Sequence, residues 1–121
     1  MDNNIITGEL TLDKLMKFEG LLERAAYLTQ ELINASKKQR KQSKQLLEES
    51  VLPLLGSNLC DYIDEYDSIA NLNHLSFLSD LTGRVNSMDY SGANKIALDF
   101  LTKFKRESRK YFSYKGNQKT L

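Results

Sequence analysis

The chain has few of the residues on which disulfide frameworks, metal sites and β-rich folds depend. Its 121 residues include one cysteine, one histidine and one proline, with six glycines and no tryptophan. A single cysteine, Cys60, excludes an internal disulfide and fits a reducing compartment. Together with His74, the only histidine, it is too little for a structural zinc site within one chain.

Signals for export and for membrane insertion are also missing from the sequence. The N-terminal residues show no basic stretch followed by an apolar run. No apolar run approaches the roughly 20 residues that a membrane-spanning helix needs. We therefore expect an intracellular protein, cytoplasmic or nuclear, without a membrane span. A glycine-rich phosphate loop is absent as well, and we predict no cofactor.

The sequence does have helical periodicity at both ends, with apolar residues recurring at steps of three and four. The first stripe predicts a helix from Leu12 towards Ala35, capped by Thr11, and consists of Leu15, Phe18, Leu22, Ala25, Thr29 and Leu32. The last predicts a helix from Asp89 to Phe112, and consists of Ala93, Ile96, Ala97, Phe100, Leu101 and Phe104. The predicted fold is all-α, a four- or five-helix antiparallel bundle over residues 11–115, with a polar lead-in at 1–10 and a tail at 116–121.

The middle of the chain is less regular. Residues 36–44 contain no apolar side chain, so they form either an exposed connector or the solvated start of a second helix. We expect that helix to end near Leu52, because Pro53 disfavours helical geometry in the residue before it. A third helix should then begin at Ser57, with Cys60 as a buried, inert thiol.

A fourth helix is expected after the turn and cap at Asn71–Asn73. His74 is predicted to be a surface or capping residue at its start. The apolar seam of this helix is predicted to be Leu75, Leu78, Leu81, Val85 and Met88.

Charge is distributed unevenly along the chain although the net charge is only +1. Nine basic and three acidic residues lie between Arg84 and the C-terminus. Such asymmetry indicates an anionic or acidic partner for one end of the molecule. The candidate partner-binding cations on the last helix are Lys103, Arg106, Arg109 and Lys110, followed by the aromatic residues Tyr111, Phe112 and Tyr114.

Two further charged groups are candidate binding residues. An acidic group on the third helix could meet the basic helix of a partner or of a second copy, and consists of Asp61, Asp64 and Glu65. A basic run could contact phosphates, and consists of Lys37, Lys38, Arg40, Lys41 and Lys44. For each group the alternative is an ordinary solvated helix face.

One stretch near the C-terminus is similar to a known family. A leucine seam leads into Met-Asp-Tyr-Ser-Gly-Ala at 88–93 and then into a helix with Ile96 and Leu101 before an aromatic pair. This order resembles the helical domain shared by the steroid receptor RNA activator protein and the C-terminus of the COPII outer-coat subunit. The tryptophan usual in that family's last helix is absent here. The resemblance spans residues 75–112, implies a five-helix, non-catalytic module inside a larger assembly, and assigns no functional residue.

We therefore predict a non-catalytic interaction module, a small subunit or adaptor in a protein or ribonucleoprotein assembly. Its expected partner is a protein, with self-association left open. One alternative is a small nucleic-acid-binding regulator that uses segments 37–44 and 103–110. Another is an inhibitor or immunity-type protein. An enzyme with Cys60 as nucleophile and His74 as base is not favoured, because a nucleophile needs its base within hydrogen-bond reach and nothing in the sequence indicates that proximity.

Overall fold

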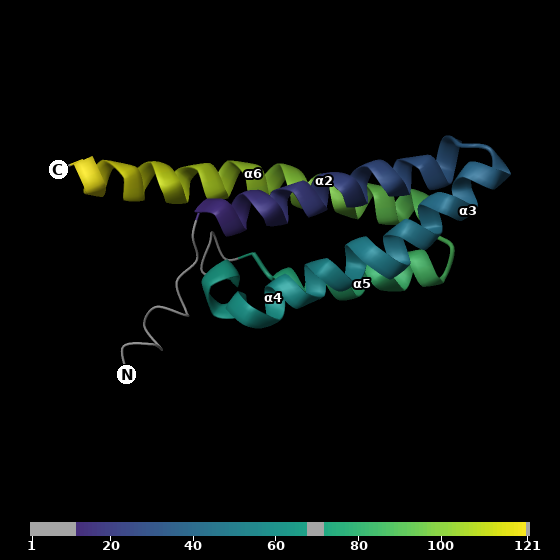
Figure 1. Ribbon diagram of the computed structural model, residues 1–121, viewed down its shortest axis with the longest axis horizontal. Helices are drawn as coiled ribbons and strands as arrows, with labels where there is room; N and C mark the ends of the chain where they lie inside the picture. Colours follow the sequence, from purple (N-terminus) through teal and green to yellow (C-terminus); the bar gives the residue numbers. More distant parts are fainter. Residues whose placement is uncertain (1–11, 68–71, 121) are drawn as a thin grey trace.

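The computed structural model describes residues 12–67 and 72–120, and the side chains of the last helix as far as Lys110. The described residues form helices and no strand, which confirms the all-α prediction (Figure 1). The elements in chain order are α2 (Leu12–Asn34), α3 (Lys37–Leu46), the π-helical turn η1 (Leu47–Val51), α4 (Leu52–Asp67), α5 (His74–Asn86) and α6 (Tyr90–Thr120).

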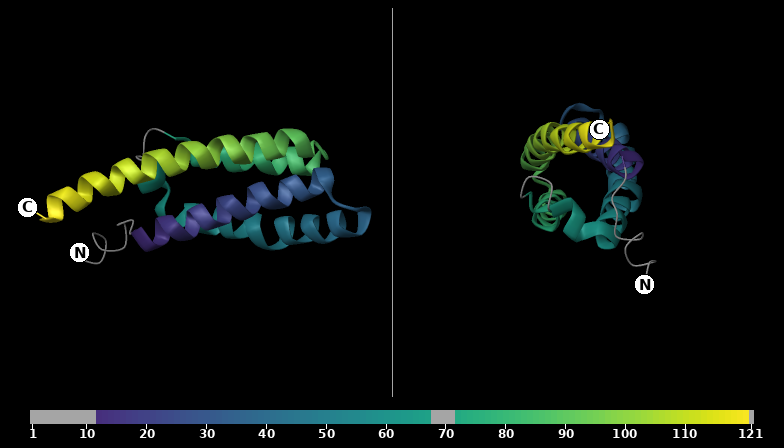
Figure 2. Two further views of the ribbon diagram at one scale, coloured as in Figure 1. Left: turned by 90° about the horizontal axis from the view of Figure 1, so that it is seen from above. Right: turned by 90° about the vertical axis from the view of Figure 1, so that its left-hand side faces the viewer.

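The helices are arranged as a bundle of four rods, because α3, η1 and α4 follow one another end to end. Viewed along the bundle, the rods surround a common axis (Figure 2). The most extensive helix–helix packing is between the first and last helices described, α2 and α6. These two run antiparallel, since Phe18 lies 5.2 Å from Phe104 between ring centroids while Ala26 accepts a hydrogen bond from Asn94. The first and last helices of the described chain thus pack side by side, which closes the bundle.

The periodic stripes of α2 and α6 form the core, as predicted. All six residues of the predicted α2 stripe are buried. On α6, Ala93, Ala97, Phe100 and Phe104 are buried, while Ile96 and Leu101 are partly buried against the core. Burying these faces removes apolar surface from water, and each Å² of apolar surface removed stabilises the fold by about 25 cal/mol. The hydrophobic pattern alone therefore places both helices correctly.

One polar contact sets how α6 lies along α2. The Asn94 side chain, only 8% exposed, donates to the Ala26 carbonyl and to Thr29 Oγ1, each at 3.0 Å. Thr29 donates in turn to the Ala25 carbonyl at 2.8 Å. A buried amide without such partners would carry a desolvation cost. Sliding α6 by one turn would break these bonds, so they fix the register.

The helix boundaries predicted around Pro53 are wrong. The helical rod runs from Lys37 to Asp67, with Ser36 as N-cap and a kink at Tyr62, and it neither ends near Leu52 nor restarts at Ser57. The π-turn accounts for this continuity, because the Leu52 N–H bonds the Leu47 carbonyl five residues back. Pro53, which has no N–H to donate, lies directly after this wide turn and inside the continuous rod. Residues 37–44 are thus the solvated start of a helix, one of the two alternatives left open.

Other expectations about the second half of the chain need correction. Leu75 and Met88, predicted in the seam of α5, are 50% and 66% exposed, and Phe77 is buried instead. Cys60 is exposed, not buried. The last helix continues through Gly116 to Thr120, beyond its predicted end. Thr11, predicted to cap the first helix, and Asn71, predicted in the turn before the fourth, lie outside the described residues.

Candidate functional site

His74 lies at the centre of the core, which corrects its prediction as a surface or capping residue. Its side chain is fully buried, and the cap of α5 is the preceding Asn73, as expected. The imidazole is surrounded by aromatic rings, with centroid distances between 5.2 and 5.9 Å to Phe18, Tyr66, Phe100 and Phe104. A histidine at the first position of a helix can face inward because α5 begins against α6.

Asp67 orients this histidine from the end of α4. Its Oδ1 lies 2.9 Å from His74 Nδ1 and also accepts the His74 backbone N–H at 3.1 Å. Burial lowers the pKa of His74 below its usual value, and the hydrogen bond to Asp67 only partly opposes this. The neutral ring therefore donates from Nδ1 to the carboxylate.

Two buried polar atoms beside this pair have no hydrogen-bond partner among the described residues, His74 Nε2 and Tyr66 Oη. Both belong to the aromatic cluster, and burial also raises the pKa of Tyr66 well above its usual value. Solvent does not reach the imidazole in this conformation, because His74 is 0% exposed. The Asp67–His74 pair thus joins the end of α4 to the start of α5.

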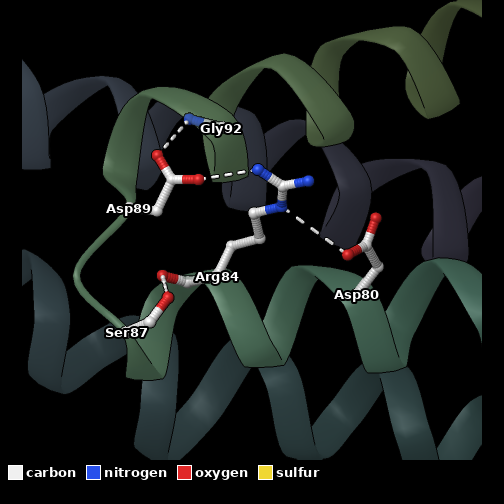
Figure 3. A network of polar contacts seen from close by, with 5 residues as sticks. All are labelled: Asp80, Arg84, Ser87, Asp89 and Gly92. Atoms are coloured by element: carbon white, nitrogen blue, oxygen red, sulfur yellow. Dashed lines mark hydrogen bonds and ion pairs between the residues drawn. The ribbon is translucent and has the colours of Figure 1, made fainter.

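The α5–α6 turn carries a second polar network (Figure 3). Arg84 lies between two carboxylates, with Nη1 2.7 Å from Asp89 and Nε 3.6 Å from Asp80. Asp89 also accepts the Gly92 N–H at 3.0 Å and so caps the start of the last helix. The hydrogen bond from Arg84 lowers the pKa of Asp89. A Cβ at Gly92 would collide with the Asp89 carboxylate, so glycine makes room for the network.

This network borders a polar hollow of about 570 Å³, lined by Ser76, Ser79, Asp80, Gly83, Arg84, Ser87 and Asp89. The two carboxylates outnumber the one cation in it, and both of them lie against the Arg84 guanidinium. The contacts span a turn that contains Met88 in a left-handed backbone conformation, with φ of 65°. We interpret the network as a clamp on this turn.

The basic stripe of α6, defined as Lys103, Arg106, Arg109 and Lys110, is exposed as predicted. Arg106 and Lys110 share the carboxylate of Glu107, at 3.2 and 3.6 Å. Lys103 and Arg109 have no carboxylate within 4.0 Å among the described residues. Tyr111, Phe112 and Tyr114 lie beyond the described side chains. The stripe thus keeps a net positive charge, partly offset by one glutamate.

The α3 cations, defined as Lys37, Lys38, Arg40, Lys41 and Lys44, form a second basic surface. Lys44 is partly buried and the other four are exposed. None forms an ion pair with a described residue, and α3 itself contains no acidic side chain. The structure therefore leaves more uncompensated charge on α3 than on the basic stripe of α6.

The predicted acidic group on α4 is divided by the fold. Asp61 and Asp64 are exposed, while Glu65 is partly buried. Tyr62, between them, has non-helical backbone angles and kinks α4. Its hydroxyl accepts a hydrogen bond from Lys14. Only two of the three carboxylates are therefore exposed, and the kink at Tyr62 lies between them.

Sequence reasoning missed a groove between the start of α5 and the middle of α6. It measures about 300 Å³ and is lined by Leu72, Asn73, Phe77, Ile96, Asp99, Phe100 and Lys103. Its floor is the stacked pair Phe77–Phe100, with ring centroids 4.0 Å apart. The sequence signal for Phe77 is its spacing: it follows His74 by three residues, so the two rings lie on the same side of α5. The groove adjoins the basic stripe, because Lys103 belongs to both.

Within the described ranges, no three His, Cys, Asp or Glu side chains are grouped so that they could hold a metal ion. None of the helices described is both long and apolar enough to cross a membrane. Comparisons of the chain with protein-family models, curated proteins and solved structures found no match. The resemblance of residues 75–112 to the helical domain of the steroid receptor RNA activator protein therefore stays a prediction.

Proposed function

We propose that this protein is a non-catalytic interaction module whose α6 stripe docks onto an acidic segment of another protein. The observation that supports this most directly is the placement of the stripe. Four cations lie within two turns of α6, on residues that stay exposed while the opposite face of the helix forms the core. Complementary charge at such a surface raises the association rate and sets orientation. The module would act as a small subunit or adaptor.

The proposal is tested by reversing charge on the stripe. Changing Lys103, Arg106 and Lys110 to Glu should weaken binding of a fluorescein-labelled oligoglutamate peptide about tenfold or more at low salt, and the difference should shrink as salt rises. Fluorescence anisotropy measures this. Each exposed substitution should change stability by only about 0.5 kcal/mol, which thermal unfolding checks.

The matched control carries the same change in charge on another helix, with Lys37, Lys38 and Lys41 changed to Glu. This variant should keep most of its affinity for the peptide. Equal losses in both variants would show that net charge alone attracts the peptide. Unchanged binding by the α6 variant would rule out the stripe.

A second candidate function is polyanion binding by the α3 cations, because all five lack a carboxylate partner among the described residues. Phosphate contacts by lysine and arginine release counterions, which makes the affinity depend on salt. A helix that presents cations without acidic neighbours is suited to such contacts. This function would make the protein a small nucleic-acid-binding regulator.

Replacing Lys37, Lys38, Arg40 and Lys41 by Gln tests the second candidate. If the α3 cations contact phosphates, the slope of log affinity against log salt should fall by about 0.7–0.9 for each contact removed. Electrophoretic mobility shift of a single-stranded and a double-stranded oligonucleotide at several salt concentrations measures it. Absence of any shift for the unmodified protein at low salt would exclude this function.

A further inference from the structure

The groove between α5 and α6 differs in chemistry from the stripe beside it. Leu72, Phe77, Ile96 and Phe100 give it apolar walls and floor. Its charged residues, Asp99 and Lys103, are both exposed and come from α6 one turn apart. At about 300 Å³ it lies at the lower end of the range of small-molecule pockets, roughly 300–1,000 Å³. That size suits an apolar side chain better than a cofactor.

The charges along this side of α6 are ordered. Asp99, Lys103, Arg106 and Lys110 follow one another at steps of four, three and four, so they line one side of the helix. Asp99 and Lys103 have the spacing of a helical ion pair, yet they are not within 4.0 Å of each other. A segment bound along this line meets a negative charge at one end of the groove and positive charges at the other.

We infer that the groove binds the apolar anchor of an acidic partner segment, a leucine-like or aromatic side chain whose carboxylates lie on one side only. The anchor contacts the Phe77–Phe100 stack, and the carboxylates extend towards Lys103, Arg106 and Lys110. Asp99 repels acidic residues on the other side of the anchor, which fixes the direction of the segment. This inference rests on the proposed function, since it names the partner of the same stripe.

The test uses three synthetic helical peptides labelled with fluorescein. The first carries one leucine followed by glutamates, the second has alanine in place of the leucine, and the third has glutamines in place of the glutamates. Losing the leucine should weaken binding to the full chain about 10- to 100-fold, as expected for burial of one large apolar side chain. Losing the glutamates should weaken it mainly at low salt.

Ile96→Trp fills the groove with an indole, and Leu98→Trp is its matched control. Leu98 lies on the same helix but is 44% exposed and does not line the groove. Ile96→Trp should reduce affinity for the leucine peptide about 10-fold or more, while Leu98→Trp should leave it unchanged. The methyl signals of Leu72 and Ile96 in the unmodified protein should shift with the leucine peptide, a readout that does not depend on how the variants fold.

The results separate this inference from the proposed function. If alanine replaces leucine without loss, or the Leu72 and Ile96 signals do not move, the groove is not the site even where charge reversal on α6 abolishes binding. If the groove effects occur but charge reversal on α6 does not weaken binding, the proposed role of the basic stripe is wrong and only binding of the apolar anchor in the groove is supported. If the protein alone sediments as a dimer and the leucine peptide converts it to a monomer, the occupant is a second copy of this chain and the stated partner is overturned.

Discussion

Phe104→Ala is expected to lower the free energy of unfolding by about 3–5 kcal/mol. The Phe104 ring is fully buried and lies near Phe18, Tyr66 and His74, with centroid distances of 5.2, 6.4 and 5.9 Å. These neighbours come from three other helices, so the site cannot collapse by moving one element. Urea denaturation followed by circular dichroism measures the loss.

Leu98→Ala on the same helix is the control for this prediction. Its side chain is 44% exposed, so its removal should cost much less than removal of Phe104. Phe100→Ala should be intermediate, because that ring is buried but borders the groove. A loss below about 1 kcal/mol for Phe104→Ala would mean that α6 does not pack on this cluster.

Acidification from about pH 7.5 to about pH 5.5 is expected to destabilise the protein through His74 alone. Burial lowers the pKa of His74 in the folded chain below the value of about 6.5 that it has when unfolded. The folded state therefore binds fewer protons, and stability falls as the pH drops below about 6.5, until it passes the folded pKa. Each tenfold difference in proton affinity corresponds to about 1.4 kcal/mol. Thermal unfolding across this pH range measures the effect.

His74→Phe should remove this pH dependence. Phenylalanine continues the aromatic cluster, and Asp67 keeps the backbone N–H at position 74 while its side chain remains 42% exposed. The titratable groups at the imidazole are Asp67 and Tyr66, and the pKa of Tyr66 is raised far from this range. With no other histidine in the chain, an equal pH dependence in the variant would contradict the assignment. So would a melting temperature of the unmodified protein that stays constant over this range.

The first and last helices could be predicted because their buried faces follow a single period. Leu15 to Leu32 and Ala93 to Phe104 keep steps of three and four, which stay in phase with an α-helix. The middle rod was not predictable in the same way. Five of its buried residues recur at every fourth position, namely Ser43, Leu47, Val51, Leu55 and Leu59, while buried Leu52 and Tyr66 lie outside this series. On a regular α-helix each such step turns by about 40°, so the line would drift off one face. That strict spacing is the sequence signal for the π-turn.

The candidate site was harder to predict because its parts come from different helices. The exposed cations of α3 and α6 follow from local sequence. Local sequence does not show whether a carboxylate from another helix lies beside a given cation. Lys105, for example, pairs at 3.0 Å with Glu23, which is far away in sequence. His74 is polar and stands at the start of a helix, which favours a surface position. Only the hydrogen bond to Asp67 and the surrounding aromatic rings explain its burial. The groove depends on how Leu72 approaches α6, which no local pattern encodes.

The π-turn also determines the rotational phase between the two halves of the middle rod. One residue on an α-helix corresponds to about 100° of rotation. Removing a single residue from Leu47–Val51 would restore a regular helix and turn α3 by that angle relative to α4. Ser43, the one buried residue of α3, would then leave its place against α2. The direction in which the α3 cations point therefore depends on one extra residue in the turn that follows α3, and not on those cations themselves.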